Sequence, residues 1–359
     1  MKKILFIAHH RLDRAPGQRY RFEQYFSYLE ENGVICYLEN IISKEDDIIL
    51  YSHGNYLKKA SIGLKSLKKR KSDLKSISQY DLVVVFREAI LTSSIFFEKR
   101  LAKIGVPILY DFDDAIWVKD VSEGNQRLSF LKNPDKIKKI LPLVSHVTAG
   151  NSYLKDFALK YNKSVTIIPS TIDTDKYKEV KKLKEGPMTI GWVGSHTTIK
   201  HFETIVPVLI KLKEKYKGKI ELQVIGDPIY HNSDLGINGI AWDNSKEVEF
   251  FNMLDIGVMP LPEDGWTKGK CGMKGLLYMS VNTPAVMSSV GMNSEIIESG
   301  VNGFLADTEE EWFVVLSKLI EDDNLRKSIG LAGRKTVEER YSMNSQKEKY
   351  LQLYLSLMN

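Results

Sequence analysis

The chain has 359 residues, of which 43% are hydrophobic and 27% are charged, and its formal net charge is +5. This length is too great for one ordinary hydrophobic core and suits a globular protein of two domains. No run of about 18 apolar residues occurs, which argues against a membrane-spanning helix. The two cysteines, Cys36 and Cys271, match no metal-binding or disulfide spacing, so we expect a reducing compartment.

Short apolar runs alternate with longer helix-like segments along the first half of the chain. The opening sequence MKKILFIAHH imitates a secretion signal, but its apolar part, Ile4–Ala8, is short and is better explained as a first buried strand. A helix is expected over Arg21–Asn32, ending at Gly33. Further strands are expected at 34–38, 81–86, 106–112, 145–150 and 165–169. Fully apolar strands between helices are typical of a parallel sheet covered on both faces.

A second series begins after the lysine-rich segment 176–187, which ends in Gly-Pro and is typical of a linker. Strands are expected at 188–194, 220–227, 254–261 and 283–289, and helices up to about Tyr216, over Leu276–Ser280 and from about Glu309. The closing segment, SMNSQKEKYLQLYLSLMN, has the pattern of an amphipathic helix. We therefore predict an α/β protein with two similar domains, residues 1–180 and 181–340, and a closing helix, 341–359, that packs back on the first domain.

The charge is unevenly distributed. Residues 1–180 contain 30 lysines and arginines against 22 acidic residues, whereas the remaining residues contain 21 against 24. The densest basic stretch, 57–76, has eight cations and one acid. It is either a solvated face or a surface that attracts anionic lipid headgroups. Nucleic acid is a third possibility, but no aromatic residue interleaves within the stretch to stack on bases.

In open parallel sheets ligands bind beyond the carboxyl ends of the strands, so residues directly after strands are the candidates for a site. In GWVGSHTTIKHFETI (191–205) a predicted strand ends at Gly194, and Ser195 or a following threonine can cap the next helix. Free amides at such a turn, with Lys200 close by, favour an anion. The stretch is also what an ordinary strand-to-helix turn looks like, and it is not a GxGxxG dinucleotide fingerprint.

GWTKGKCGMKGLLYMS (265–280) places Lys270 and Lys274 on one helix face, four residues apart. Two cations so close repel each other unless an anion or water separates them, although a surface lysine pair needs no function. Their coincidence with glycine turns and with Lys200 suggests three lysines around one diphosphate. In SSVGMNSEII (288–297), Gly291 permits close backbone approach to a ligand, and Glu295 is either an acceptor for sugar hydroxyls or an ordinary acid at a helix start.

Two motifs follow strands of the first domain. YDFDDAIW (110–117) contains Asp111, Asp113 and Asp114, which could bind a metal or hydroxyl groups, act as a base, or simply cap a helix. APGQRYRFEQY (15–25) offers Gly17 and Arg19, whose backbone and guanidinium could meet a phosphate, while Arg21 could be a surface residue.

At this point the chain resembles a known family, the family 4 retaining glycosyltransferases of the glycosyltransferase-B fold, which have two Rossmann-like domains facing across a cleft. The resemblance covers most of residues 188–341. The stretches that carry it are WVGSHTTIKHFETI, LQVIGDP, LDIGVMPLPEDGWTKGKCGMKGLLYMSVNTPAV, SSVGMNSEIIESGVNGFLA and GRKTVEERYS. APGQRYR and YDFDDAIW resemble one branch of the family less specifically.

The resemblance implies roles for individual residues. Lys200 corresponds to a lysine that touches the donor diphosphate, and Ser195 stands where many members have an arginine. The residues that would bind the donor are Gly194, Ser195, Gly226, Asp227, Trp242, Gly291, Met292, Asn293 and Glu295. The family's paired glutamates fall on Gly269 and Leu277 here, so Lys270 and Lys274 could have taken over charge stabilisation. Asp113 and Asp114 would orient the sugar or acceptor, and Gly17 and Arg19 would lie on the acceptor or phosphate side.

The resemblance implies a retaining glycosyltransferase that moves a sugar from a nucleotide-sugar to a glycan or polyprenyl-linked glycan in bacterial surface polysaccharide synthesis. We expect no metal and no cofactor, a cytoplasmic location, an anionic membrane surface as a possible contact of 57–76, and no nucleic acid partner. The alternatives are a nucleotide-sugar 2-epimerase and a noncatalytic nucleotide-sugar-binding homologue. The loss of the two glutamates is the best argument for the noncatalytic alternative.

Overall fold

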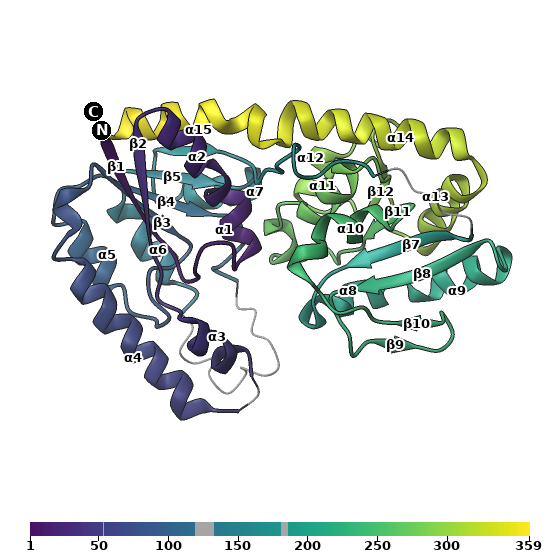
Figure 1. The fold of residues 1–359 in the computed structure, drawn as a ribbon, viewed down its shortest axis with the longest axis horizontal. Helices are drawn as coiled ribbons and strands as arrows, with labels where there is room; N and C mark the ends of the chain where they lie inside the picture. The colour runs from purple at the N-terminus through teal and green to yellow at the C-terminus, as the bar shows by residue number, and fades with distance from the viewer. Residues whose placement is uncertain (53, 119–132, 181–185) are drawn as a thin grey trace. The chain divides into compact units, whose positions relative to one another are not determined.

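A computed structural model describes residues 1–52, 54–118, 133–180 and 186–359 (Figure 1). The chain forms two compact units. The first consists of Met1–Ser170 with Gln346–Asn359, and the second consists of Thr171–Ser345. The structural division therefore falls ten residues before the sequence-based boundary at 180, and the last residues of the closing helix are grouped with the first unit.

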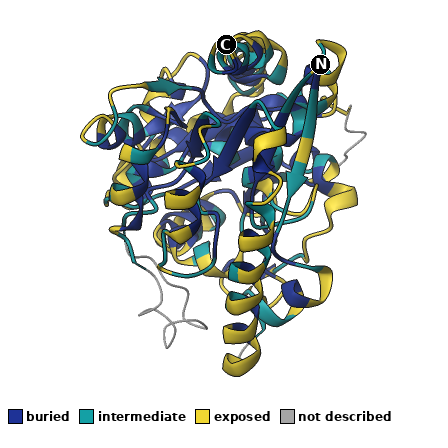
Figure 2. Cartoon of the chain, turned by 90° about the vertical axis from the view of Figure 1, so that its left-hand side faces the viewer, coloured by how far each residue is buried: buried dark blue, intermediate teal, exposed yellow. Residues whose placement is uncertain are grey.

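A six-stranded parallel sheet forms the centre of the first unit, in the order β2-β1-β3-β4-β5-β6. The central strands β1, β3, β4 and β5 are largely buried, as the dark blue strands of Figure 2 show, whereas β2 and β6 are only partly buried. Because the chain leaves β1 on one side for β2 and on the other for β3, the winding direction reverses between β1 and β3. The strands are β1 (Lys2–Ile7), β2 (Val34–Glu39), β3 (Leu82–Phe86), β4 (Ile108–Phe112), β5 (His146–Ala149) and β6 (Val165–Ile167). The helices are α1 (Pro16–Arg21), α2 (Phe26–Glu31), α3 (Lys44–Tyr51), α4 (Tyr56–Asp73), α5 (Phe96–Leu101), α6 (Lys136–Ile140) and α7 (Ser152–Ala158).

The second unit contains a five-stranded parallel sheet in the order β13-β12-β11-β7-β8, and its winding reverses between β7 and β11. Its strands are β7 (Met188–Val193), β8 (Ile220–Ile225), β11 (Ile256–Met259), β12 (Ala285–Met287) and β13 (Phe304–Leu305), with a separate hairpin of β9 (His231–Asn232) and β10 (Ile237–Asn238). Its helices are α8 (Ile199–Glu203), α9 (Val206–Lys215), α10 (Glu247–Asn252), α11 (Met273–Ser280), α12 (Met292–Ile296), α13 (Glu309–Glu321) and α14 (Asp323–Thr336). The last helix, α15 (Met343–Leu357), crosses the boundary between the units.

The predicted alternation of buried strands and helices is confirmed, and with it the α/β class of both units. Two details differ from the prediction. The helix expected over Arg21–Asn32 is broken, because Phe22 leaves the helical region at φ −144° and a 3₁₀ turn, Glu23–Tyr25, separates α1 from α2. The β9–β10 hairpin and β13 are too short to give a periodic signal, and they were not expected. Part of the predicted linker, 181–185, lies outside the described residues.

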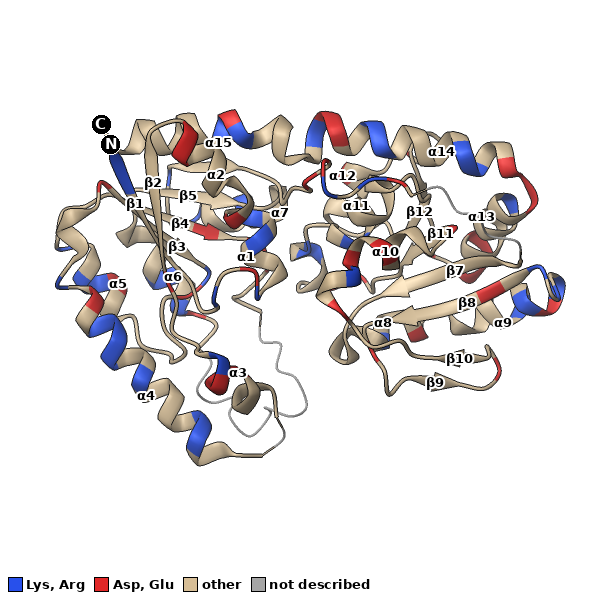
Figure 3. Cartoon of the chain, viewed as in Figure 1, with Lys and Arg blue, Asp and Glu red and all other residues tan. Residues whose placement is uncertain are grey.

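The basic stretch 57–76 forms most of α4, whose lysines and arginine are visible in Figure 3. It is not simply a solvated face. Arg70 is fully buried, where it donates to the carbonyls of Ala8 and Ala89 and pairs with Asp73. Lys65 is bonded to Asp46 at 3.0 Å. Among the helices of the described residues, none is both long and apolar enough to cross a membrane.

Candidate active site

The turn after β7 is in contact with Lys274 of α11. A Cβ atom at Gly194 would lie 2.8 Å from Lys274 Nζ and would collide with the Trp192 ring, so the chain needs glycine here. The Lys274 ammonium lies over that indole, 4.3 Å from its ring centroid. Two of the predicted site elements, separated by 80 positions in the sequence, therefore meet at the carboxyl end of β7.

Lys274 is held in a position that disfavours its charge. Burial, followed by the charge of Lys270, lowers the pKa of Lys274 to about 7. Lys270 itself lies over the Trp266 ring, with its Nζ 4.2 Å from the centroid. Each ammonium thus has an aromatic face as a neighbour, an attraction worth about 0.5–2 kcal/mol.

His201 of α8 lies within electrostatic reach of all three predicted lysines. Its side chain is buried, and its pKa is lowered to about 4 by burial and then by the positive charges of Lys274, Lys200 and Lys270. Asp264 opposes this effect only in part. Three lysines, one on α8, one directly after the 3₁₀ turn Thr267–Gly269 and one on α11, therefore act on one side chain. His201 was not selected from the sequence, because a histidine inside a helix gives no signal of its charged neighbours.

The segment that leads from β11 to Lys270 is folded tightly on itself. Asp264 accepts hydrogen bonds from the amides of Trp266 and Thr267, at 2.8 and 2.7 Å. Burial disfavours the Asp264 carboxylate, but the bonds from Thr267 and Trp266 outweigh it and lower its pKa. This cap fixes the 3₁₀ turn Thr267–Gly269 directly before Lys270.

The loop after β12 lies against the same segment. A Cβ at Gly291 would be 2.6 Å from the carbonyl oxygen of Lys268. Met292 and Asn293 are buried at the start of α12, where the Asn293 amide donates to the Ser288 carbonyl at 3.0 Å and its Oδ1 is buried without a hydrogen-bond partner. Glu295 is exposed, and it lies one turn further along α12.

The turn after β8 adjoins the turn after β7. Gly226 has φ +105°, and a Cβ there would collide with the carbonyl oxygen of Gly194. The next residue, Asp227, is 1% exposed and its Oδ2 lies 2.9 Å from His196 Nδ1. Trp242, also predicted for donor binding, is partly exposed and donates from Nε1 to Asn244 at 2.6 Å.

In the first unit, Asp113 and Asp114 follow β4 and are both bound by Arg87. Arg87 Nε lies 2.6 Å from Asp113 Oδ1, and a terminal nitrogen lies 2.6 Å from Asp114 Oδ2. Arg87 directly follows β3 with φ +56°, an unusual backbone conformation for a residue with a side chain, and its carbonyl accepts from the Tyr110 hydroxyl. A Cβ at Gly17 would approach both Arg87 and Asp113 to 3.3 Å. The structure thus brings Gly17 and the two aspartates together.

Arg21 and Asp111 form a second, fully buried ion pair beneath this cluster. Both side chains are at most 4% exposed, the guanidinium also donates to the Ile168 carbonyl, and Thr148 donates to Asp111 at 2.6 Å. The expectation that Arg21 could be a surface residue is therefore wrong. Arg19, the predicted phosphate ligand, is partly exposed and lies over the Tyr20 ring at 5.2 Å.

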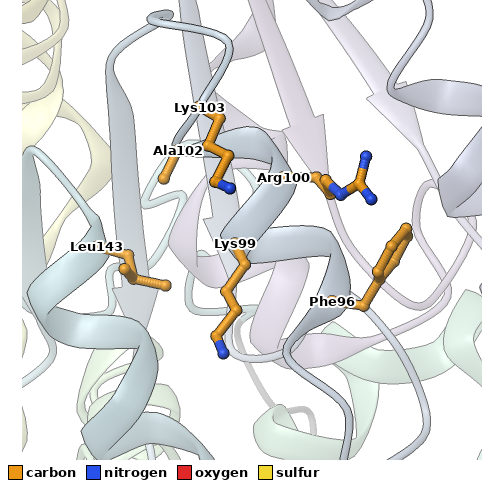
Figure 4. A pocket seen from close by; sticks show the side chains of 6 residues that line it. All are labelled: Phe96, Lys99, Arg100, Ala102, Lys103 and Leu143. Carbon is orange, nitrogen blue, oxygen red and sulfur yellow. The ribbon is translucent and has the colours of Figure 1, made fainter.

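A shallow pocket elsewhere in the first unit is unrelated to these residues. It is lined by Phe96, Lys99, Arg100, Ala102, Lys103 and Leu143 (Figure 4). Residues 99–103 and 143 precede β4 and β5, so they lie at the amino edge of the sheet, opposite to Asp113 and Asp114. Within the described ranges, no three His, Cys, Asp or Glu residues are grouped as metal ligands would be.

Comparison with solved structures defines the class of fold. Sucrose-phosphate synthase from Thermosynechococcus elongatus has a TM-score of 0.71 and 15% identity, with 99% of each chain covered. HepE from Anabaena, solved in complex with UDP and glucose, has a TM-score of 0.66 and 13% identity, covering 99% of this chain and all of that one. The chain has the glycosyltransferase-B fold, with two Rossmann-like domains.

Sequence comparison assigns the second unit more closely. Residues 187–322 match the family model of glycosyl transferases group 1. An uncharacterized glycosyltransferase of Methanocaldococcus jannaschii is 24% identical over 265 residues, 68% of this chain and 66% of that relative. The capsular polysaccharide biosynthesis glycosyltransferase CapM of Staphylococcus aureus is 25% identical over 183 residues, 48% of this chain and 47% of CapM. The matches therefore span between about half and two thirds of these curated relatives, and the stretch 187–322 is similar to the glycosyl transferases group 1.

Proposed function

We propose that the protein is a metal-independent, retaining glycosyltransferase that transfers a sugar from a nucleotide-sugar to a glycan or lipid-linked glycan. The observation that carries the proposal is the contact of the Lys274 ammonium with the Gly194 turn at the carboxyl end of β7, with Lys200 and Lys270 near enough for their charges to lower the pKa of the same buried residue, His201. A protein gains nothing from such mutual repulsion in itself. A bound diphosphate would relieve it.

The chemistry follows from where charge develops. Cleavage of the bond between the sugar and the diphosphate leaves negative charge on the phosphate oxygens, and cations fixed in advance stabilise that charge without reorganisation. Lys274 is confined between the Gly194 turn and Trp192, so it is positioned before the ligand arrives. In this proposal the lysines supply the charge stabilisation that a divalent ion would otherwise give.

The Gly226, Asp227 and Trp242 segments would hold the nucleotide, and the Gly291–Asn293 loop would hold the donor sugar. Support for the second assignment is the buried, unpartnered Oδ1 of Asn293, beside the start of α11. The HepE structure contains UDP and glucose, which makes a uridine nucleotide the first donor to test.

The first unit would bind the acceptor. Arg87 is paired with both Asp113 and Asp114, and we assign these two carboxylates to positioning an acceptor hydroxyl. The departing phosphate would then take the acceptor's proton. The match to CapM, named for capsular polysaccharide biosynthesis, supports a surface polysaccharide as the product.

We also propose that α4 rests on an anionic membrane surface near the lipid-linked acceptor. Leu57 and Leu64 on this helix are 89% and 69% exposed, and Lys58, Lys68 and Lys71 are exposed beside them. Each cation near an anionic surface contributes about 1 kcal/mol, and the leucines would add apolar burial.

The test is donor hydrolysis and transfer with purified protein and a panel of nucleotide-sugars. Lys270→Ala and Lys274→Ala should each reduce turnover roughly a hundred- to a thousandfold, the usual effect of removing one fixed donor from a developing anion. Lys211→Ala is the matched control, because Lys211 is an exposed lysine of the same unit paired with Glu309. Unchanged turnover in either site variant would refute the role assigned to that lysine.

The products separate the two alternatives. A 2-epimerase would release isomerised donor or free sugar without any acceptor. A noncatalytic homologue, suggested by Gly269 and Leu277 in place of the family's glutamates, would bind a nucleoside diphosphate in a thermal-shift screen but hydrolyse no donor.

Addition of a chelator should leave the transfer rate unchanged if the lysines suffice, and a loss of activity would contradict metal independence.

A further inference from the structure

His196 and Asp227 form a pair that joins the turns after β7 and β8. His196 Nδ1 lies 2.9 Å from Asp227 Oδ2. The two side chains differ sharply in exposure, because the histidine is 64% exposed and the aspartate only 1%. One edge of the imidazole is therefore anchored to a buried carboxylate, while the rest of the ring is open to solvent.

The Asp227 carboxylate is short of partners. Its Oδ1 is buried and accepts no hydrogen bond, and among the described side chains only His196 pairs with it. A buried carboxylate needs a hydrogen-bond donor, and His196 Nδ1 is placed to supply one. An imidazole that carries a hydrogen on both nitrogens donates from Nδ1 to Asp227 and has Nε2–H left as a second donor.

The backbone around the pair is fixed by close contacts. Gly226, directly before Asp227, is pressed against the Gly194 carbonyl, and a Cβ at Gly239 would collide with the Asp227 carbonyl. The Asp227 carbonyl also accepts from the Tyr230 amide at 3.2 Å. The carboxylate that orients the imidazole therefore has little freedom to move.

We infer that His196 is a further donor-binding residue, a cation that donates from Nε2 to a phosphate oxygen of the nucleotide-sugar. This inference rests on the proposed function and refines one of its assignments: the Asp227 carboxylate, grouped above with the donor-binding residues, acts through His196 as a positioning group and does not itself contact the nucleotide. His196 directly follows Ser195, which stands where many members of the resembled family have an arginine. It precedes Lys200 by four positions. The diphosphate would thus meet an oriented imidazolium as well as the lysines.

The experiment measures binding by isothermal titration calorimetry. The probe is whichever of UDP, GDP, CDP, ADP and dTDP binds the wild type most tightly, together with the corresponding uncharged nucleoside. The variants are His196→Gln, Asp227→Asn and the double variant. His231→Gln is the matched control, since His231 is another exposed histidine of the unit whose Nδ1 is hydrogen-bonded, to Asn238 at 2.9 Å.

We expect His196→Gln to weaken binding of the diphosphate at least ~10-fold, the effect of losing one charge-assisted hydrogen bond, and to leave nucleoside binding unchanged. Asp227→Asn should weaken diphosphate binding by a smaller factor, and the double variant should bind no more weakly than His196→Gln, because Asp227 acts only through the histidine. His231→Gln should bind as the wild type does.

Two results would overturn the inference while leaving the proposed function intact. One is diphosphate binding by His196→Gln within twofold of the wild type. The other is an equal loss of diphosphate and nucleoside affinity, which would indicate a distorted turn. A wild type that binds none of the five diphosphates would instead overturn the proposed function, and this inference with it.

Discussion

Replacement of Lys274 by methionine should make the protein more stable and less able to bind its donor. Methionine keeps the length and the apolar stem of the side chain and removes its charge. That charge is unfavourable in the unliganded protein, because burial and Lys270 both act against it. A lysine kept for structural reasons would behave in the opposite way.

The magnitude follows from the pKa of Lys274, which is lowered from the ordinary 10.5 to about 7. Each tenfold change in acidity corresponds to ~1.4 kcal/mol, so the cost of the charge has an upper bound of about 5 kcal/mol at pH 7 and below. The side chain is partly exposed, which screens this cost, so we expect Lys274→Met to raise the free energy of unfolding by about 1–3 kcal/mol.

The pH dependence has a defined sign. Between pH 7 and 10.5 the unfolded chain keeps a proton on Lys274 that the folded protein has released, so this group makes the stability of the wild type rise with pH in that range. The variant lacks the group. Its advantage over the wild type should therefore be largest at pH 7 and below, and should shrink as the pH rises towards 10.

The assay is urea unfolding at pH 6.5 and 9, followed by tryptophan fluorescence, to which four of the five tryptophans contribute from the second unit. Binding of a nucleoside diphosphate is measured in parallel. Lys211→Met, an exposed lysine, is the control and should change neither property by much. The reasoning would be refuted if Lys274→Met were less stable than the wild type at pH 6.5, or if it bound the diphosphate equally well.

Three further predictions concern the first unit. Arg21→Ala should lower the free energy of unfolding by about 3–5 kcal/mol, because it leaves the buried Asp111 carboxylate unpaired, and Arg21→Ala combined with Asp111→Ala should be less destabilising in urea titrations. Arg87→Gly should be about 1 kcal/mol more stable than Arg87→Ala, because both variants lose the ion pairs but only glycine adopts φ +56° without steric strain. Equal unfolding midpoints of the two variants would argue against backbone strain at this position. Leu57→Ser with Leu64→Ser should reduce sedimentation with anionic vesicles several-fold at unchanged donor hydrolysis, and equal sedimentation would remove α4 as the membrane contact.

The strands could be predicted because each is a short apolar run between helical segments, a pattern that survives without knowledge of tertiary contacts. The helix expected over Arg21–Asn32 could not be predicted correctly. Its periodicity is helical on both sides of Phe22, but Arg21 is drawn into the core to meet Asp111, and the chain changes direction directly after it. A buried ion pair between residues 90 positions apart leaves no trace in local periodicity.

Residues of the candidate site could be selected from the sequence where their position directly after a strand marked them. Gly194 was selected for that reason, and Lys274 was selected as one of two lysines four residues apart beside glycine turns; the structure places Gly194 and Lys274 in contact. Arg87 and His201 were missed, because their importance lies in which charges surround them. Only the fold brings Lys200, on the helix of His201, and the lysines of the later segment within electrostatic reach of that histidine.

The two units differ in charge at the carboxyl edges of their sheets, as the proposed transfer between two different substrates would require. In the first unit one arginine, Arg87, faces two carboxylates, Asp113 and Asp114, an arrangement that suits an uncharged acceptor hydroxyl. In the second unit burial, and then neighbouring positive charges, lower the pKa of both Lys274 and His201, and these charges make the local potential positive in the absence of ligand. Such an edge attracts a diphosphate and offers little to a neutral sugar alone. We infer that the phosphates supply most of the binding free energy of the donor, so affinity should fall steeply from the nucleoside diphosphate to the nucleoside and change little when the sugar is removed.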